Sequence, residues 1–191
     1  MPEYRRAFVD AGSFFLTVVT NFRRPLLATE SARSTLKNAL RATQAERPFS
    51  IDAIVVLPDH WHTIWTLPPG DTDFSTRMRL VKARFTRAFL GAGGSEAGRS
   101  RSRQAQGERS VWQRRFWEHT VRDERAFEGI CDYIHYNPVK HGYATCPHAW
   151  PYSSFRRFVV DRRYDASWQC SCEGRTPRKL QLQSVDGIAG E

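Results

Sequence analysis

The pattern of apolar and polar positions predicts a regular series of strands and helices. Aromatic and β-branched residues dominate residues 13–22, which is typical of a strand. Apolar residues at helical spacing follow over residues 31–44, and Thr29 is placed to cap that helix at its N-terminus. Residues 50–57 and 60–67 predict two further strands in a tight hairpin, because a Pro-Asp pair between them is typical of a turn.

The second half of the chain continues with helix and strand in turn. Residues 74–90 carry an apolar stripe on one side and arginines and lysine on the other, which predicts an amphipathic helix. Residues 91–109 are rich in glycine, serine and arginine and nearly lack apolar side chains, so we expect a mobile loop. A strand over residues 118–121 precedes a helix expected to end near Tyr136, because the residue before Pro138 avoids helical backbone.

This order of elements defines a single α+β domain. Strand, helix, strand, strand, helix, strand is the ferredoxin-like βαββαβ arrangement, a four-stranded antiparallel sheet backed by helices. The helix after the last strand is an extra element, and it carries Tyr133. We place the domain at residues 1–158 and expect residues 159–191 to form a basic to polar, largely irregular tail. Because this topology hosts many functions, function must be argued from the site.

Composition indicates an anionic partner. The chain of 191 residues has 29 lysines and arginines against 20 aspartates and glutamates, a formal net charge of +9. This excess favours nucleic acid as the partner. No apolar run reaches the roughly 20 residues that cross a bilayer. The N-terminus also lacks the features of a signal peptide, so we expect a cytoplasmic protein.

The four cysteines predict no structural zinc site. They lack the paired CxxC spacing that is typical of such sites. Cys170 and Cys172 could bind a metal together, but they lie in the polar tail, and their role stays open. The other two are Cys131 and Cys146.

The strongest chemical signal is the pair His60 and His62, which flank Trp61 in the third predicted strand. Side chains alternate along a strand, so the two histidines point to one face and Trp61 points to the other. Two neighbouring imidazoles form half of a divalent-metal site. The alternative interpretation is a pair of polar residues on a solvated face.

Tyr133 and Asn137 share one face of the last helix, because they are four residues apart. If this face meets the two histidines, an amide oxygen joins two imidazoles in a site suited to Mg²⁺ or Mn²⁺. A tyrosine beside such a metal is a candidate nucleophile toward phosphorus. Tyr136 is a competing nucleophile one turn away, whereas His135 points elsewhere and is expected to be structural or to contact DNA.

Several motifs together resemble the REP-associated tyrosine transposases, a group of single-tyrosine HUH nucleases in which HUH denotes His, hydrophobic residue, His. The resemblance covers about residues 1–158, with the motifs in the same order and spacing. The motifs are Leu57-Pro58-Asp59-His60-Trp61-His62, Tyr133-Ile134-His135-Tyr136-Asn137-Pro138-Val139-Lys140-His141-Gly142, Trp150-Pro151-Tyr152-Ser153-Ser154, Pro2-Glu3-Tyr4-Arg5-Arg6 and Phe116-Trp117-Glu118-His119.

The resemblance implies a metal-dependent enzyme that cleaves and joins single-stranded DNA beside REP hairpins, which are short palindromic repeats of bacterial genomes. It implies that His60, His62 and Asn137 bind Mg²⁺ or Mn²⁺. It further implies that Tyr133 attacks the DNA, forms a 5′-phosphotyrosine and releases a 3′-hydroxyl. The protein is then expected in the bacterial cytoplasm, associated with the nucleoid when bound to DNA, as a monomer with a homodimer left open.

We expect DNA contacts from basic residues in several regions. By resemblance, Arg5 and Arg6 are candidates for reading the tetranucleotide beside the hairpin. The charged side of the helix over residues 74–90 could follow phosphates, although a solvated helix face is the alternative. The full set of candidate DNA-binding residues is Arg5, Arg6, Arg23, Arg24, Arg77, Lys82, Arg84, Lys140 and His141.

Two rival functions stay open at this point. One is a regulatory protein that binds nucleic-acid hairpins without cutting them, and the other is a metal hydrolase that uses water as nucleophile. The complete set of candidate ligands argues against the first. The hydrolase would release a free 5′-phosphate and leave no covalent adduct with DNA.

Overall fold

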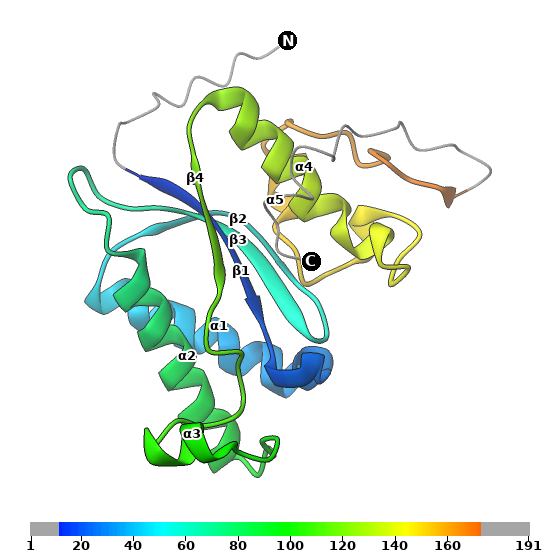
Figure 1. The fold of residues 1–191 in the computed structure, drawn as a ribbon. Coiled ribbons are helices and arrows are strands. Elements are labelled where there is room, and N and C mark those ends of the chain that lie inside the picture. The colour runs from blue at the N-terminus through cyan, green and yellow to red at the C-terminus, as the bar shows by residue number, and fades with distance from the viewer. Residues whose placement is uncertain (1–11, 173–191) are drawn as a thin grey trace.

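The computed structural model describes residues 12–172, which form helices on both sides of one sheet (Figure 1). Arg5 and Arg6 lie outside the described residues. The strands are β1 (Ser13–Val19), β2 (Ser50–Val56), β3 (His60–Thr66) and β4 (Trp117–Val121). The helices are α1 (Glu30–Glu46), α2 (Phe74–Gly91), α3 (Arg101–Ala105), α4 (Glu124–Lys140) and α5 (Phe155–Val160), with short 3-10 turns η1 (Asn21–Arg23), η2 (Leu26–Ala28) and η3 (Pro147–Ala149).

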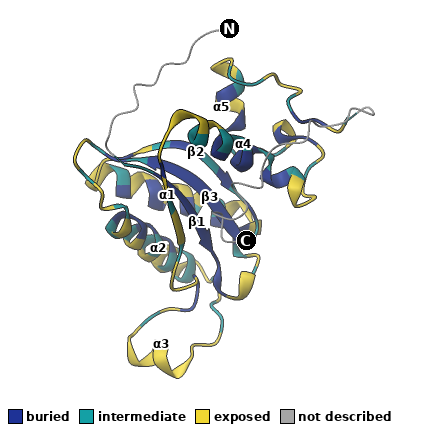
Figure 2. Cartoon of the chain, turned by 45° about the horizontal axis from the view of Figure 1, so that its top comes forward, coloured by how far each residue is buried: buried dark blue, intermediate teal, exposed yellow. Residues whose placement is uncertain are grey.

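The sheet has the strand order β2-β3-β1-β4, and all neighbouring strands are antiparallel. Helix α1 connects β1 to β2, and α2 lies between β3 and β4. This is the ferredoxin-like βαββαβ topology, so the predicted fold is confirmed. The two central strands, β3 and β1, are buried almost throughout (Figure 2).

The two faces of the sheet carry different layers. Helices α1 and α2 pack on one face, where Leu16, Trp61 and Trp65 lie in the core. Helix α4 packs on the opposite face against Phe15 and Ile64 (Figure 1). Because side chains alternate along β3, the residues on either side of Trp61 point toward α4.

Helix α4 continues to Lys140, so the prediction that it ends near Tyr136 is wrong. Pro138 lies in its last turn, and Asn137 and Pro138 are both buried. The restriction on a residue before proline is a preference, and tertiary packing outweighs it here. Since the helix extends, the backbone N–H of His141 donates to the Asn137 carbonyl at 3.0 Å and closes the last turn.

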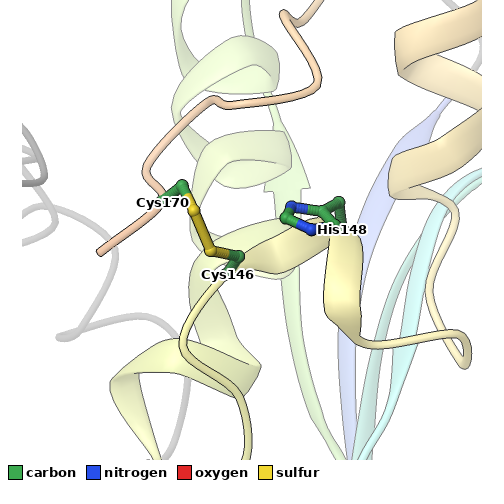
Figure 3. Close-up of side chains that lie close together, drawn as sticks. All are labelled: Cys146, His148 and Cys170. Carbon is green, nitrogen blue, oxygen red and sulfur yellow. A yellow bond between two sulfur atoms is a disulfide. The ribbon is translucent and has the colours of Figure 1, made fainter. Parts of the chain in front are cut away.

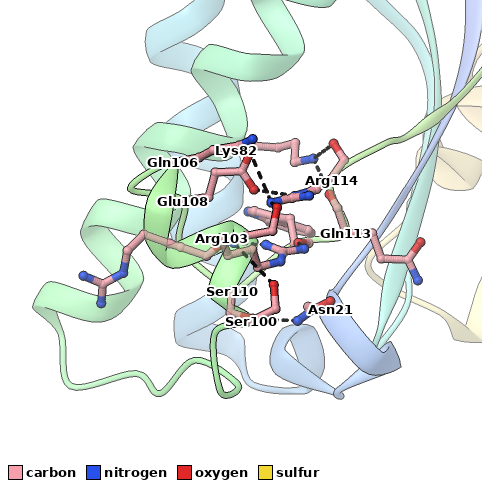
Figure 4. Close-up of polar contacts among 12 residues, drawn as sticks. Asn21, Lys82, Ser100, Arg103, Gln106, Glu108, Ser110, Gln113 and Arg114 are labelled. Atoms are coloured by element: carbon pink, nitrogen blue, oxygen red, sulfur yellow. Dashed lines mark hydrogen bonds and ion pairs between the residues drawn. The ribbon is translucent and has the colours of Figure 1, made fainter.

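The segment of residues 91–109 is more ordered than its composition predicts. It forms the short helix α3, which begins after the N-cap Ser100. Glu96 pairs with Arg109 at 3.0 Å and accepts the backbone N–H of Ser110 at 2.6 Å. Arg103 donates to backbone carbonyls of the same region (Figure 4). The segment thus contains one short helix, held by local caps and ion pairs in place of apolar contacts, while the expectation that it is mobile stays a prediction.

The predicted boundary at residue 158 falls within α5. The chain after this helix packs back onto it, since Tyr164 stacks on Phe155 and Phe158 with ring centroids 5.5 Å apart in each case. Trp168 in turn stacks on Tyr164 at 4.4 Å. The described part of the tail is thus joined to the domain by aromatic packing.

Candidate functional site

His60 and His62 form a buried pair at the start of β3, on the face toward α4. Their side chains are 1% and 0% exposed, and their ring centroids lie 4.9 Å apart. The Nδ1 atom of His60 lies 2.6 Å from Asp59 Oδ1, and that of His62 lies 2.9 Å from the hydroxyl of Thr17. Each ring is therefore held through Nδ1, so Nε2 is the nitrogen that would bind a cation.

Asp59 links this pair to a surface arginine. Its Oδ2 lies 3.1 Å from Nη1 of Arg23. Burial raises the pKa of Asp59, but the hydrogen bond and charge of His60, and then those of Arg23, outweigh burial and hold this pKa below 3.8. Asp59 is therefore a carboxylate at neutral pH, and it accepts the Nδ1 proton of His60.

Helix α4 presents one face to the histidine pair. The Tyr133 ring lies 5.3 Å from the His62 ring, and the His141 ring lies 5.2 Å from the His60 ring. Asn137 lies on the helix between these two contacts, four residues from each. Its side chain is fully buried, and neither amide atom has a hydrogen-bond partner among the residues that the structure describes.

Tyr133 is packed by aromatic and cationic groups. Its ring meets Phe15 edge-on at 6.0 Å. Nζ of Lys140 lies 4.8 Å from the centre of the Tyr133 ring. This places the ammonium group over the face of the ring, in a cation–π contact.

The candidate DNA-binding residues divide into two groups. Arg23, Lys140 and His141 lie at the site, through the contacts with Asp59, Tyr133 and His60 described above. Arg24 follows Arg23, but its guanidinium donates to the backbone oxygen and hydroxyl of Ser95.

The three candidates on α2 lie on the far face of the sheet. Arg77 is 3% exposed, pairs with Asp71 at 2.7 Å and donates to the Pro48 carbonyl, so its assignment as a DNA contact is wrong. Lys82 donates to two backbone carbonyls (Figure 4), and burial, then the charge of Arg103, lowers its pKa to about 8.

Arg84 is also part of the scaffold, since it joins α2 to Thr43 and Glu46 of α1. The charge pattern on this helix thus reflects contacts within the protein. A basic helix face carries no information about which side of the sheet it covers, so the sequence could not place these three residues relative to the histidine pair.

His135 is structural, as the alternative interpretation held. It is fully buried, and its Nε2 lies 2.8 Å from the Ser154 hydroxyl. Burial, then the charges of Arg157 and Arg163, lower the pKa of His135 to about 3, so it is neutral at physiological pH. A fully buried, neutral imidazole cannot contact DNA, so His135 belongs to the protein scaffold.

The depressed pKa of His135 predicts acid sensitivity. Below pH 6.5 the unfolded chain binds a proton at this residue and the folded chain does not. The contribution of neutral His135 to the free energy of unfolding is therefore complete above pH 6.5. As the pH falls from 6.5 toward 3, this contribution decreases by about 1.4 kcal/mol per pH unit. Urea unfolding of wild type and His135→Gln should show the difference between their free energies of unfolding shrinking by this amount per unit between pH 5.5 and 4. A difference independent of pH would contradict the assignment.

Two residues at the site escaped sequence reasoning. Thr17 lies on β1, and the strand register places it opposite both His62 of β3 and Trp117 of β4. Directly paired residues share a face, so a row of three side chains crosses the sheet at the site. Asp59 was assigned only to a turn, although a carboxylate beside a histidine ligand is a common supporting residue of metal sites.

Comparison with known proteins assigns the chain to a family. Residues 9–137 match the family described as "Transposase IS200 like". The chain is 40% identical over 168 residues to the REP-associated tyrosine transposase of Escherichia coli K12, covering 88% of this chain and 91% of that protein. A solved structure of the REP-associated tyrosine transposase bound to a REP hairpin is 37% identical, with a TM-score of 0.68 over 95% of this chain and 98% of that one.

The chain therefore belongs to the IS200-like transposases, and within them to the REP-associated tyrosine transposases. It is thus an enzyme of DNA transposition. Transposases of this family are generally metal-dependent. Among residues 12–172, no helix combines the length and apolar character needed to cross a membrane.

The side chains at this site are of the types that bind divalent cations. Two imidazoles held through Nδ1 and a buried amide that has no partner among residues 12–172 offer two nitrogens and one oxygen. Such a mixed set suits Mn²⁺ and accepts Mg²⁺ when phosphate oxygens complete the coordination.

Proposed function

We propose that this transposase cleaves and rejoins single-stranded DNA next to REP-like hairpins through a 5′-phosphotyrosine on Tyr133. His60, His62 and Asn137 would hold Mg²⁺ or Mn²⁺ beside the reacting phosphate. The relative solved with a REP hairpin supports the substrate class. Because chromosomal DNA is the substrate, we place the activity in the bacterial cytoplasm.

One observation carries the proposal. The same face of α4 that brings the Tyr133 ring within 5.3 Å of His62 also carries the buried amide of Asn137, which has no hydrogen-bond partner in the described part of the chain. A buried amide normally has hydrogen-bond partners, and leaving it without them costs about 1–3 kcal/mol. A cation ligand next to a tyrosine explains why the fold retains both groups.

Tyr133 supplies the nucleophile. A tyrosine phenol ordinarily has a pKa of about 10, so its proton must leave before or during attack. The ammonium of Lys140 over the ring favours the negative charge on the phenol oxygen. This oxygen forms a bond to phosphorus, the bond from phosphorus to the 3′-oxygen breaks, and the departing oxygen takes up a proton to become a 3′-hydroxyl.

A bound cation would polarise the phosphate and stabilise the negative charge that develops on its oxygens. His60 and His62 orient the site, since Asp59 and Thr17 fix their rings. The bond between Tyr133 and the 5′-phosphate keeps the phosphodiester energy. A 3′-hydroxyl of another strand can therefore attack this phosphorus, release the tyrosine and join the strands without ATP.

The experiment that tests this function uses a hairpin oligonucleotide with a single-stranded 5′ tail, incubated with protein and Mn²⁺. The proposal predicts a protein–DNA adduct that survives denaturation and is absent after chelation of the metal. A free 5′-phosphate without adduct would indicate a hydrolase. Binding without any cleavage would indicate the regulatory hairpin-binding protein.

Trp117 is placed to stack on an unpaired base. It is 49% exposed, and its register with Thr17 puts it on the same face as His62. Stacking of a base on an aromatic ring contributes about 1–3 kcal/mol. Trp117→Ala should therefore weaken binding of the tailed hairpin about tenfold, as measured by fluorescence anisotropy.

Trp117→Phe is the matched control for this prediction, because it keeps an aromatic face. It should bind within about threefold of wild type. Equal affinity for wild type and Trp117→Ala would contradict the stacking role, as would an equal loss in both variants.

A further inference from the structure

We infer that Cys146, His148, Cys170 and Cys172 form a zinc site, separate from the histidine site of the strand. They occur as two short motifs far apart in the chain, Cys146-Pro147-His148 and Cys170-Ser171-Cys172. Sequence spacing argued against a zinc site, but the fold brings the two motifs together. The ligand atoms of Cys146, His148 and Cys170 all lie within 4.8 Å of one another (Figure 3).

The fourth member is Cys172. Its sulfur lies 2.6 Å from the sulfur of Cys146, which is also paired with Cys170 as a disulfide. The zinc site forms only after two electrons from a cellular thiol reductant convert this disulfide into two thiolates, so the disulfide and the zinc site are alternative states. A disulfide needs two sulfurs only. A disulfide therefore does not explain why a third cysteine and a histidine lie beside the same two sulfurs. Three cysteines and one histidine are a complete ligand set for tetrahedral zinc.

The backbone holds the two motifs in place. The N–H and the hydroxyl of Ser171 both donate to the carbonyl of Thr145, at 3.1 Å and 2.7 Å. The backbone N–H of Cys172 donates to the sulfur of Cys170 at 3.4 Å. Once the disulfide is reduced, this donation would stabilise the thiolate of Cys170, the form that binds a metal.

The ligand chemistry favours zinc over the cations of the histidine site. Thiolates select soft or borderline ions, and Mg²⁺ avoids them. The inference rests on the proposed function, which places the protein in the cytoplasm. In that compartment thiols stay reduced and can bind metal. His148 is exposed and Cys172 is half-buried, so an ion can reach the site from solvent.

With four protein ligands, such a site is structural. It would close the chain between Cys146 and Cys170, a sequence separation of 24. The enclosed segment contains η3, α5 and the aromatic stack of Tyr164 and Trp168. The ion would thus fasten the C-terminal segment to the loop that follows the tyrosine-bearing helix α4.

The test begins with the full chain purified with a phosphine reductant and without added metal. Elemental analysis should find about one zinc ion per chain, and a mercurial reagent should release it. His148→Ala changes an exposed residue and should weaken zinc binding at least about tenfold without unfolding the chain. A protein free of zinc whose intact mass shows the loss of two hydrogens would overturn the inference and indicate a disulfide.

Cobalt substitution separates the two metal sites. Co²⁺ bound by thiolates gives a near-ultraviolet charge-transfer band, which should disappear in Cys146→Ser and persist in His60→Ala. Cys131→Ala is the matched cysteine control and should keep the band, since Cys131 lies on the buried face of α4 in the core. Persistence of the band in Cys146→Ser would overturn the inference. Loss of adduct formation with retained zinc would count against the proposed function alone.

Discussion

Tyr133→Phe should lower formation of the covalent DNA adduct by at least about a thousandfold, because it removes the attacking oxygen. The substitution deletes only that atom. The ring contacts with Phe15 and His62 are kept, so the fold and the binding of the hairpin should change little. Adduct formation is measured on denaturing gels with a labelled tailed hairpin, and binding is measured in parallel.

Tyr136→Phe is the matched control, since it removes a phenol oxygen from the same helix three residues further along, about one turn away. Tyr136 is half-buried, whereas Tyr133 is fully buried against the histidine pair. The control should form adduct at a rate close to that of wild type. Adduct formation by Tyr133→Phe together with its loss in Tyr136→Phe would transfer the nucleophile to Tyr136.

Asn137→Leu should separate stability from activity. Leucine has a shape similar to asparagine and needs no hydrogen bonds, so it relieves the cost of a buried amide that has no partner among residues 12–172. We expect the metal-free variant to be more stable than wild type by about 1–2 kcal/mol, measured by urea unfolding in the presence of chelator. Cleavage should fall about a hundredfold, because one ligand of the cation is lost.

Metal titration provides the control for this variant. A ligand that binds only the folded state raises its stability, so Mn²⁺ should stabilise wild type. It should stabilise Asn137→Leu much less. If the leucine variant is destabilised and still cleaves DNA at the wild-type rate, Asn137 is an ordinary packing residue and the proposed ligand set is wrong.

The sequence was informative about the site wherever the relevant pattern is local. Alternation along one strand placed His60 and His62 on one face, and the spacing of four residues placed Tyr133 and Asn137 together on a helix. The structure confirms that this helix packs on the histidine face. The ferredoxin-like topology also follows from the order of elements alone.

Contacts between distant segments were not predictable in the same way. Thr17 supports His62 through the register of two strands, which no local pattern specifies. Arg77 was taken for a DNA contact because charge on a helix does not reveal a partner within the protein such as Asp71. Cys146 and Cys170 are brought together because the chain returns after α5. The spacing of cysteines in the sequence does not predict such a return.

The most direct test of the central claim is to identify the residue that carries the DNA. The adduct formed with the tailed hairpin and Mn²⁺ is digested with nuclease and protease, and the peptides are sequenced by mass spectrometry. We predict a nucleotide attached through its 5′-phosphate to Tyr133. Attachment to any other residue, or recovery of all DNA ends as free 5′-phosphates, would contradict the account.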